Sequence, residues 1–293
     1  MAHKWQGTGL IWQRRYFFLG VGDRSDMHAT HAVIVCISLG AGTSFQLRTE
    51  DEHGLKSYRA AIIAPGVRHS KVCDKAGVII LLYLTPETDE SYRIRDKYLR
   101  AGGIAEVPPA VLDVLTPQLG EYRLDRYKEI HRLNNKQAKA LCEEMDCARG
   151  EALCGKIISA LGVAPSTDLS KELDPRVRTA IEVMDEKVRD RATADELKVE
   201  EIRREVDDRL VQAKKPCGLG EAFKDSVDVT MGHYKVGLRL REALTEINPD
   251  AVVRRLAVKF GLFDGPALSN VFYDWLGIRP NEIKKQSYFR RCQ

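Results

Sequence analysis

The sequence predicts an α+β protein in which a β-rich first part precedes a helical second part. Its 293 residues exceed the roughly 200 that one hydrophobic core commonly serves, so we expect more than one domain. The first hundred residues contain short apolar runs bounded by glycines, whereas the residues after Pro86 contain apolar positions at helical spacing. The composition, with 44% hydrophobic, 30% charged and 7% aromatic residues, is typical of a soluble globular protein.

Closely spaced strands with glycine turns predict a barrel or sandwich over residues 1–88. Val33–Leu39 is a β-rich run ended by glycines, and Val78–Leu84 is apolar enough to be a central strand. The other candidate strands cover residues 10–12, 16–19, 45–47 and 58–64.

Residues 89–163 form a helical region between the two parts. Two or three helices are expected over 109–161, and their apolar stripe suits either of two roles. They pack against the β-rich part, or they form the surface of a homodimer, which we slightly favour. Residues 164–170 are polar and turn-rich, which predicts a linker.

Helix start and stop signals recur from residue 174 onward. Asp174 and Pro175 supply an N-cap and a first-turn proline, and Asn248 and Pro249 repeat that signal. Further helices are expected over 193–213, 219–226, 230–247, 249–260 and 265–276. Glycines at 261 and 277 end the last two helices of the series.

The last two of these helices, joined by a short glycine-containing turn, predict a helix-turn-helix, whose second helix fits the major groove of DNA. Residues 257–263, 268–272 and 277–283 resemble the second helix-turn-helix of the AraC family in order and spacing. Residues 219–224 and 234–244 resemble the end of the first unit of that family and its connecting helix. The resemblance covers nearly the whole chain and implies a transcription regulator that binds double-stranded DNA.

Carried over onto this sequence, the resemblance implies a set of DNA-contacting side chains. Asparagine can pair with adenine and serine with either base, whereas lysine and arginine hold phosphates. The basic residues are concentrated near the end, where residues 234–293 hold 11 Lys and Arg against 6 Asp and Glu. The predicted DNA-binding residues are Lys214, Lys215, Lys224, Arg239, Arg241, Ser269, Asn270, Tyr273, Lys284 and Lys285.

The chain also departs from the family pattern. Asn270 stands where arginine is usual, and Glu221 and Asp274 place negative charge on the two expected recognition helices. About eleven extra residues precede Phe223, most of them charged. We interpret the first unit as divergent, which leaves open that the helical half contacts a protein such as RNA polymerase or another regulator.

The β-rich part is similar to the cupin fold at a proline-glycine turn that is followed by His69. Cupin enzymes bind a transition metal through histidines and an acid, but the first motif here, with His28 and His31, lacks the His-x-His spacing, and no acid follows before Glu50. We therefore expect no metal and a small-molecule effector in the barrel, although the same side chains would also suit an empty core. The predicted effector pocket comprises His28, His31, Tyr58, His69 and Tyr83.

Other patterns limit the function classes. No nucleophile–base pairing, glycine-rich phosphate loop or paired carboxylates appear, so we expect neither an enzyme nor a cofactor; a cupin metalloenzyme with a helical appendage is the alternative. No apolar run approaches the roughly 18 residues of a membrane span, which predicts a cytoplasmic protein. Seven dispersed cysteines predict reduced thiols, and the spacings of Cys142, Cys147 and Cys154 fit no tight zinc pattern.

The expected organisation is therefore a cupin-like β-barrel sensor domain over 1–88, a helical linker or dimerisation region over 89–163, and an AraC-type double helix-turn-helix DNA-binding domain over 174–293.

Overall fold

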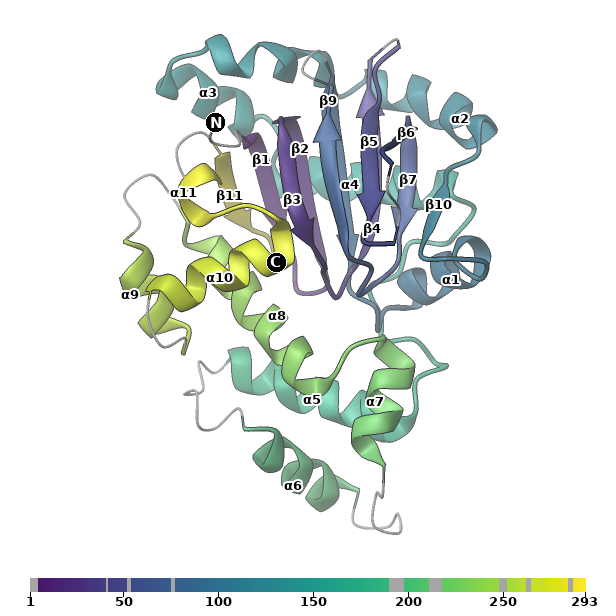
Figure 1. The fold of residues 1–293 in the computed structure, drawn as a ribbon, viewed down its shortest axis with the longest axis vertical. Coiled ribbons are helices and arrows are strands. Elements are labelled where there is room, and N and C mark those ends of the chain that lie inside the picture. The colour runs from purple at the N-terminus through teal and green to yellow at the C-terminus, as the bar shows by residue number, and fades with distance from the viewer. Residues whose placement is uncertain are drawn as a thin grey trace.

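The structure is a computed structural model that describes residues 5–40, 42–51, 54–74, 77–189, 198–210, 218–247, 252–261, 265–283 and 287–293. Within these residues the β-rich part forms two sheets, with the helical half packed below them and to their left (Figure 1). The larger sheet has the order β10-β7-β4-β9-β2-β1-β11, and the smaller has the order β3-β8-β5-β6. No described helix has the length and apolar character needed to cross a bilayer.

The strands of the larger sheet are β1 (Trp5–Ile11), β2 (Arg15–Gly22), β4 (Val33–Leu39), β7 (Ala60–Ile63), β9 (Val78–Leu84), β10 (Ile104–Glu106) and β11 (Ser287–Arg291). Those of the smaller sheet are β3 (Arg24–His28), β5 (Phe45–Thr49), β6 (Lys56–Tyr58) and β8 (His69–Cys73).

β9 is central, as its apolar run predicts, and pairs antiparallel with β2 and β4. Alternate residues of the strand enter two different cores because side chains alternate across a sheet. Ile80 and Leu82 face the helices that follow the sheet, whereas Ile79 and Leu81 share a core with Phe45 of the smaller sheet. Burial on both faces explains why β9 is apolar throughout and not alternating.

Helices from the middle of the chain cover one face of the larger sheet. They are α2 (Pro109–Gly120), the 3-10 helix η1 (Leu124–Arg132), α3 (Asn135–Glu143) and α4 (Cys147–Ala160), preceded by α1 (Asp89–Tyr98). Leu115, Tyr127 and Ile157 are buried in the same core as the sheet residues. The structure therefore favours the packing interpretation of residues 109–161, and a dimer surface there stays a prediction.

The helical half has two parts. A first core joins α5 (Pro175–Arg189), α6 (Val199–Arg209), α7 (Leu219–Val227) and the start of α8 (Met231–Thr245). The second part comprises α9 (Val253–Lys259), α10 (Gly265–Leu276) and α11 (Pro280–Ile283).

Local signals explain the helix ends. The Arg176 backbone N–H donates to the Asp174 carboxylate over 2.8 Å, which confirms that cap. Gly261 and Gly277 both have φ near +66°, a left-handed conformation that favours glycine after a helix. The second cap signal, at Asn248 and Pro249, lies outside the described residues.

The end of the chain returns to the sheet, which the sequence analysis did not anticipate. β11 runs parallel to β1, with Gly7 opposite Ser287 and Ile11 opposite Arg291, so the yellow strand lies beside the purple one in Figure 1. Cys292 then forms a disulfide with Cys147 across a sequence separation of 145. Two expectations therefore differ from the structure: these two cysteines form a disulfide here instead of two reduced thiols, and the last residues form part of the sheet and not of a separate helical domain.

Candidate functional site

A cavity of about 80 Å³ lies between the sheet and the helical half. Both halves supply its walls, because the inner faces of β1, β2 and β9 meet α8, α10 and α11 there. The lining is largely apolar and aromatic, and its members are Trp5, Leu10, Ile11, Tyr16, Phe17, Phe18, Thr30, His31, Lys71, Leu81, Tyr83, Gly237, Leu240, Arg241, Leu244, Trp275, Leu276, Ile278, Ile283 and Phe289. A molecule in this cavity would contact both halves at once.

Two cations reach the cavity, and they differ in their partners. Arg241 is neutralised, because its guanidinium lies 3.8 Å from the Asp185 carboxylate and 3.1 Å from that of Glu242. Lys71 on β8 is only 2% exposed, and its ammonium lies 5.2 Å from the centre of the Trp5 ring. Burial lowers the pKa of Lys71, whereas Cys36, Tyr83 and Cys73 raise it and outweigh burial, and none of these three neighbours is a carboxylate. Within the described residues, the cavity therefore holds one positive charge without a counter-ion.

His31 and Tyr16 add polar atoms that have no partner among the described residues. Both ring nitrogens of His31 and the Tyr16 hydroxyl are buried and lack a hydrogen bond. Burial, with smaller effects from His233 and Arg241, lowers the pKa of His31 to about 3, so the ring is neutral near pH 7. Burial also raises the pKa of Tyr16, which keeps its proton. Both side chains can thus exchange hydrogen bonds with a bound molecule.

The structure brings together only part of the predicted effector pocket. His31 and Tyr83 line the cavity. His28 and His69 contact each other instead, with ring centres 4.3 Å apart and ring planes tilted by 51°, and each Nδ1–H donates to a backbone carbonyl. Tyr58 stacks on Phe45 and lines a separate polar cleft.

The histidine pair does not by itself make a metal centre. Within the part of the chain that the structure describes, no cluster of three or more His, Cys, Asp or Glu could hold a metal ion. The cupin metalloenzyme alternative therefore gains no support from the geometry of His28 and His69.

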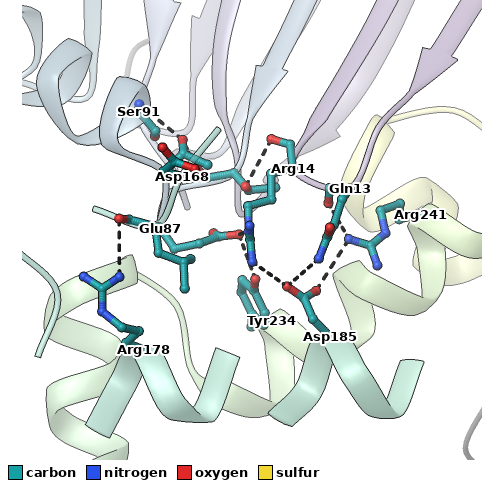
Figure 2. A network of polar contacts seen from close by, with 12 residues as sticks. Gln13, Arg14, Glu87, Ser91, Asp168, Arg178, Asp185, Tyr234 and Arg241 are labelled. Carbon is teal, nitrogen blue, oxygen red and sulfur yellow. Dashed lines mark hydrogen bonds and ion pairs between the residues drawn. The ribbon is translucent and has the colours of Figure 1, made fainter. Parts of the chain in front are cut away.

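Next to the cavity, a buried polar network joins the two halves (Figure 2). Asp185 of α5 accepts hydrogen bonds from Gln13 over 3.1 Å and from Arg14 over 2.9 Å, both in the turn between β1 and β2. The Arg241 guanidinium donates to the Gln13 carbonyl. The Tyr234 hydroxyl of α8 donates to Glu87, which follows β9, over 2.8 Å. Since charges and hydrogen bonds fix orientation, this network sets how the halves sit together.

The predicted linker is also part of this junction. Ser170 N–H donates to the Glu87 carbonyl over 2.8 Å, and Asp89 N–H donates to the Asp168 carbonyl over 2.9 Å. Arg178 of α5 donates to the Ser170 carbonyl over 2.6 Å. The linker residues are thus bound to both halves.

The helix-turn-helix formed by α9 and α10 packs beside β3. Asp26 N–H donates to the Gly277 carbonyl over 2.9 Å, and Ala29 N–H donates to the Asp274 carbonyl over 3.0 Å. The other side of α10 faces solvent, where Pro266, Asn270 and Asp274 are exposed one turn apart. This exposed face is the part of α10 that can approach a duplex.

The predicted DNA-binding residues fall into three groups. Lys224 and Asn270 are exposed, and Ser269 is half-buried with its hydroxyl donating to the Gly265 carbonyl over 2.9 Å. Arg239 is half-buried and donates to the Gly261 carbonyl over 3.0 Å. The predicted Lys214, Lys215, Lys284 and Lys285 lie outside the described residues.

The structure gives two of these residues contacts within the protein. Arg241 is 6% exposed and lies inside the junction, because α8 turns that side toward the sheet and Asp185 compensates its charge. This burial argues against a DNA contact by Arg241. Tyr273 is half-buried, donates its hydroxyl to Asp26 over 3.3 Å and lies under Arg279, so its DNA contact stays a prediction.

Lys71 is the cavity residue that sequence reasoning missed. A signal was present: His69, Lys71 and Cys73 alternate along one strand and are all buried. A lysine at an inward position of a half-buried strand is unusual enough to indicate a site.

Together, the two sheets, the helices that cover them and the helical half have a fold that is shared with a solved structure of ToxT. The chain matches no protein-family model and no curated protein sequence. Among solved structures it is similar to the apo form of a point variant of ToxT from Vibrio cholerae strain SCE256, with a TM-score of 0.50 and 11% identity over 92% of this chain and 97% of that chain. For wild-type ToxT of that strain bound to an unsaturated fatty acid, the TM-score is 0.45 and the identity 10%, over 93% of this chain and 94% of that chain. For the AraC-like transcriptional activator CuxR, the TM-score is 0.30 and the identity 10%, over 80% of this chain and 78% of that chain.

Proposed function

We propose that this protein is a cytoplasmic DNA-binding transcription regulator whose activity responds to a small effector held between its halves, and that it is not an enzyme. The AraC-type fold supports the regulator class. The single observation that carries the effector proposal is the cavity whose walls come from both halves. A ligand that prefers one relative placement of the halves shifts the population toward it, because binding energy differs between the placements.

The chemistry of the cavity favours a largely apolar ligand with one carboxylate. Lys71 supplies a buried charge that has no counter-ion among the described residues, and a carboxylate would satisfy it with a charge-assisted hydrogen bond. His31 and Tyr16 would bind the remaining lone pairs. The aromatic walls, including Trp5 and Trp275, suit a compact apolar body.

A matched pair of probes tests this ligand class. Intrinsic tryptophan fluorescence reports binding, because Trp5 and Trp275 line the cavity. We expect propanoate, which suits a cavity of about 80 Å³, to bind at least tenfold more tightly than 1-propanol, and we expect Lys71→Met to remove that difference. Lys139→Met, at an exposed residue of α3, is the control. Equal affinities for the acid and the alcohol in the unmodified protein would reject the carboxylate assignment.

DNA binding is tested by fluorescence anisotropy with the DNA upstream of the gene. Asn270→Ala should weaken specific binding about 5- to 100-fold, the range for loss of one good base contact, and leave random-sequence binding unchanged. Lys224→Ala should weaken binding to all sequences equally and reduce the salt slope by about 1. Lys139→Ala should change neither. Affinity for upstream DNA no better than for random duplex would refute the regulator function.

We also propose that the protein is a homodimer, and that it contacts RNA polymerase or another regulator when bound to DNA. The solvent side of α2 supports the dimer, since Ala110, Val114 and Pro117 are exposed there and form an apolar strip. Sedimentation should show a dimer that Val114→Glu converts to a monomer. A monomer in the unmodified protein at tens of micromolar would reject this part.

A further inference from the structure

We infer that Cys147 and Cys292 are a peroxide-responsive thiol pair whose disulfide clamps the end of the helical half onto the sheet. The DNA readout of this inference rests on the proposed function, whereas its structural readout does not. The disulfide joins the first residue of α4 to the residue that follows β11.

The surroundings of the pair distinguish it from the other cysteines. Cys147 is partly exposed at the start of the 14-residue helix α4, the end of a helix that favours negative charge. Cys292 is the second residue from the end of the sequence and directly follows two arginines. Such a partly exposed site near positive charge is where thiols react.

The other described cysteines, Cys36, Cys73, Cys142 and Cys154, are buried and unpaired. Burial raises the pKa of Cys36 to about 12 and that of Cys73 to about 11, which keeps both thiols protonated and inert. Cys292 is 6% exposed, so Cys147 is the member of the pair that an oxidant in solution meets first.

The disulfide reinforces a strand that is otherwise held along one edge. β11 is the outermost strand of the larger sheet, and its partner among the described strands is β1. The Ser287 hydroxyl donates to the Trp5 carbonyl over 2.8 Å, and Cys292 N–H donates to the Ile11 carbonyl over 2.8 Å. Phe289 of the same strand lines the cavity. Cutting the disulfide removes the covalent cross-link that holds this strand in place.

The redox conditions of the compartment decide whether the disulfide is present. A DNA-binding protein works where glutathione and thioredoxin keep thiols reduced, so a disulfide there is transient. The Cys147 thiolate attacks hydrogen peroxide and becomes a sulfenic acid with loss of hydroxide, which takes up the thiol proton as water. The Cys292 thiol then displaces the sulfenic oxygen as a second water. Two thiols and one peroxide thus give the disulfide and two waters, and a dithiol reverses this by becoming a disulfide itself.

The clamp restricts the second helix-turn-helix. α10 and α11 lead directly into β11, and the end of α10 is bonded to β3 through Asp26 and Gly277. Two recognition helices must adjust to successive segments of the major groove. Because the oxidised protein has less freedom for this adjustment, oxidation lowers its affinity for DNA.

Hydrogen exchange and DNA titration of the full chain test the clamp. After peroxide treatment, mass spectrometry should find the linked Cys147 and Cys292 peptides. In dithiothreitol, amide exchange at 287–291 and 5–11 should become at least tenfold faster, and affinity for upstream DNA should rise at least fivefold. Cys147→Ser should behave as the reduced protein under both conditions, and Cys36→Ala should keep the response.

Equal exchange in the oxidised and reduced protein, or no linked peptide, would overturn the inference. Equal DNA affinity in both states, with specific binding present, would overturn the regulatory step and leave the proposed function intact. Faster exchange on reduction without DNA binding in either state would support the clamp and reject the DNA-binding function.

Discussion

Asp185 is the residue on which the junction between the halves depends most. Its carboxylate is 4% exposed and compensates both Arg14 and Arg241. Asp185→Asn should lower the free energy of unfolding by about 3 kcal/mol, because Arg14 and Arg241 each lose one of their two carboxylate partners in the junction. Urea denaturation measures this. Asp96→Asn, in an exposed pair with Arg100 on α1, should cost less than about 1 kcal/mol; similar losses in both variants would contradict the assigned role.

His31 makes stability depend on pH. Its pKa falls from 6.5 to about 3 on folding, chiefly through burial. Between these values the unfolded chain binds a proton that the folded chain does not bind, so acid favours unfolding. The contribution of His31 to the free energy of unfolding should be constant above pH 6.5 and fall by about 1.4 kcal/mol per pH unit below it, until about pH 3.

His69 adds to the same slope, because burial lowers its pKa to about 4. The slope of the unfolding free energy against pH gives the number of protons that the chain takes up when it unfolds. His31→Gln should lower that number by about one between about pH 6 and about pH 4.5, and leave the contribution of His69. Chemical denaturation at a series of pH values gives that slope. An unchanged slope in His31→Gln would mean that the ring is protonated in the folded protein.

At the scale of elements, Gly237 sets the distance between α8 and its neighbours. A Cβ at this position would lie 2.6 Å from the Trp275 ring of α10 and 2.8 Å from His31. Gly237→Ala should lower the free energy of unfolding by about 1–3 kcal/mol through overpacking and weaken binding in the cavity beside it. Denaturation and the fluorescence titration measure the two effects.

Gly232 on the same helix provides the control. The nearest atom to a Cβ there is 4.0 Å away, and alanine favours a helix over glycine by up to about 1 kcal/mol. Gly232→Ala should therefore stabilise the protein slightly. If both alanine variants were stabilising, α8 would not pack as closely as the structure has it.

At the scale of the whole molecule, the two halves share one hydrophobic core. Ile79 and Leu81 of the sheet pack in the same cluster as Leu240 of α8 and Phe272 of α10. The full chain should therefore unfold in a single cooperative transition, with far-UV circular dichroism and tryptophan fluorescence coinciding. Two separated transitions, one for each half, would show that the shared core does not couple them.

The sequence by itself determined the elements and the fold class. Val33–Leu39 and Val78–Leu84 could be identified as strands because a buried strand needs a short apolar run. The ends of the helices could be placed at Asp174, Gly261 and Gly277 because caps and left-handed glycines act within a few residues. The AraC-type arrangement followed from those local signals in their order.

Only the tertiary structure decided which distant residues meet. The pairing of β1 with β11 and the bond from Cys147 to Cys292 join residues far apart in the chain, and no local pattern encodes such contacts. Arg241 has the appearance of a DNA contact in the sequence, yet folding buries it beside Asp185. Lys71 lines the cavity for the same reason. The environment of a charged side chain is set when one half packs on the other, and that packing is the sum of many weak contacts between distant residues.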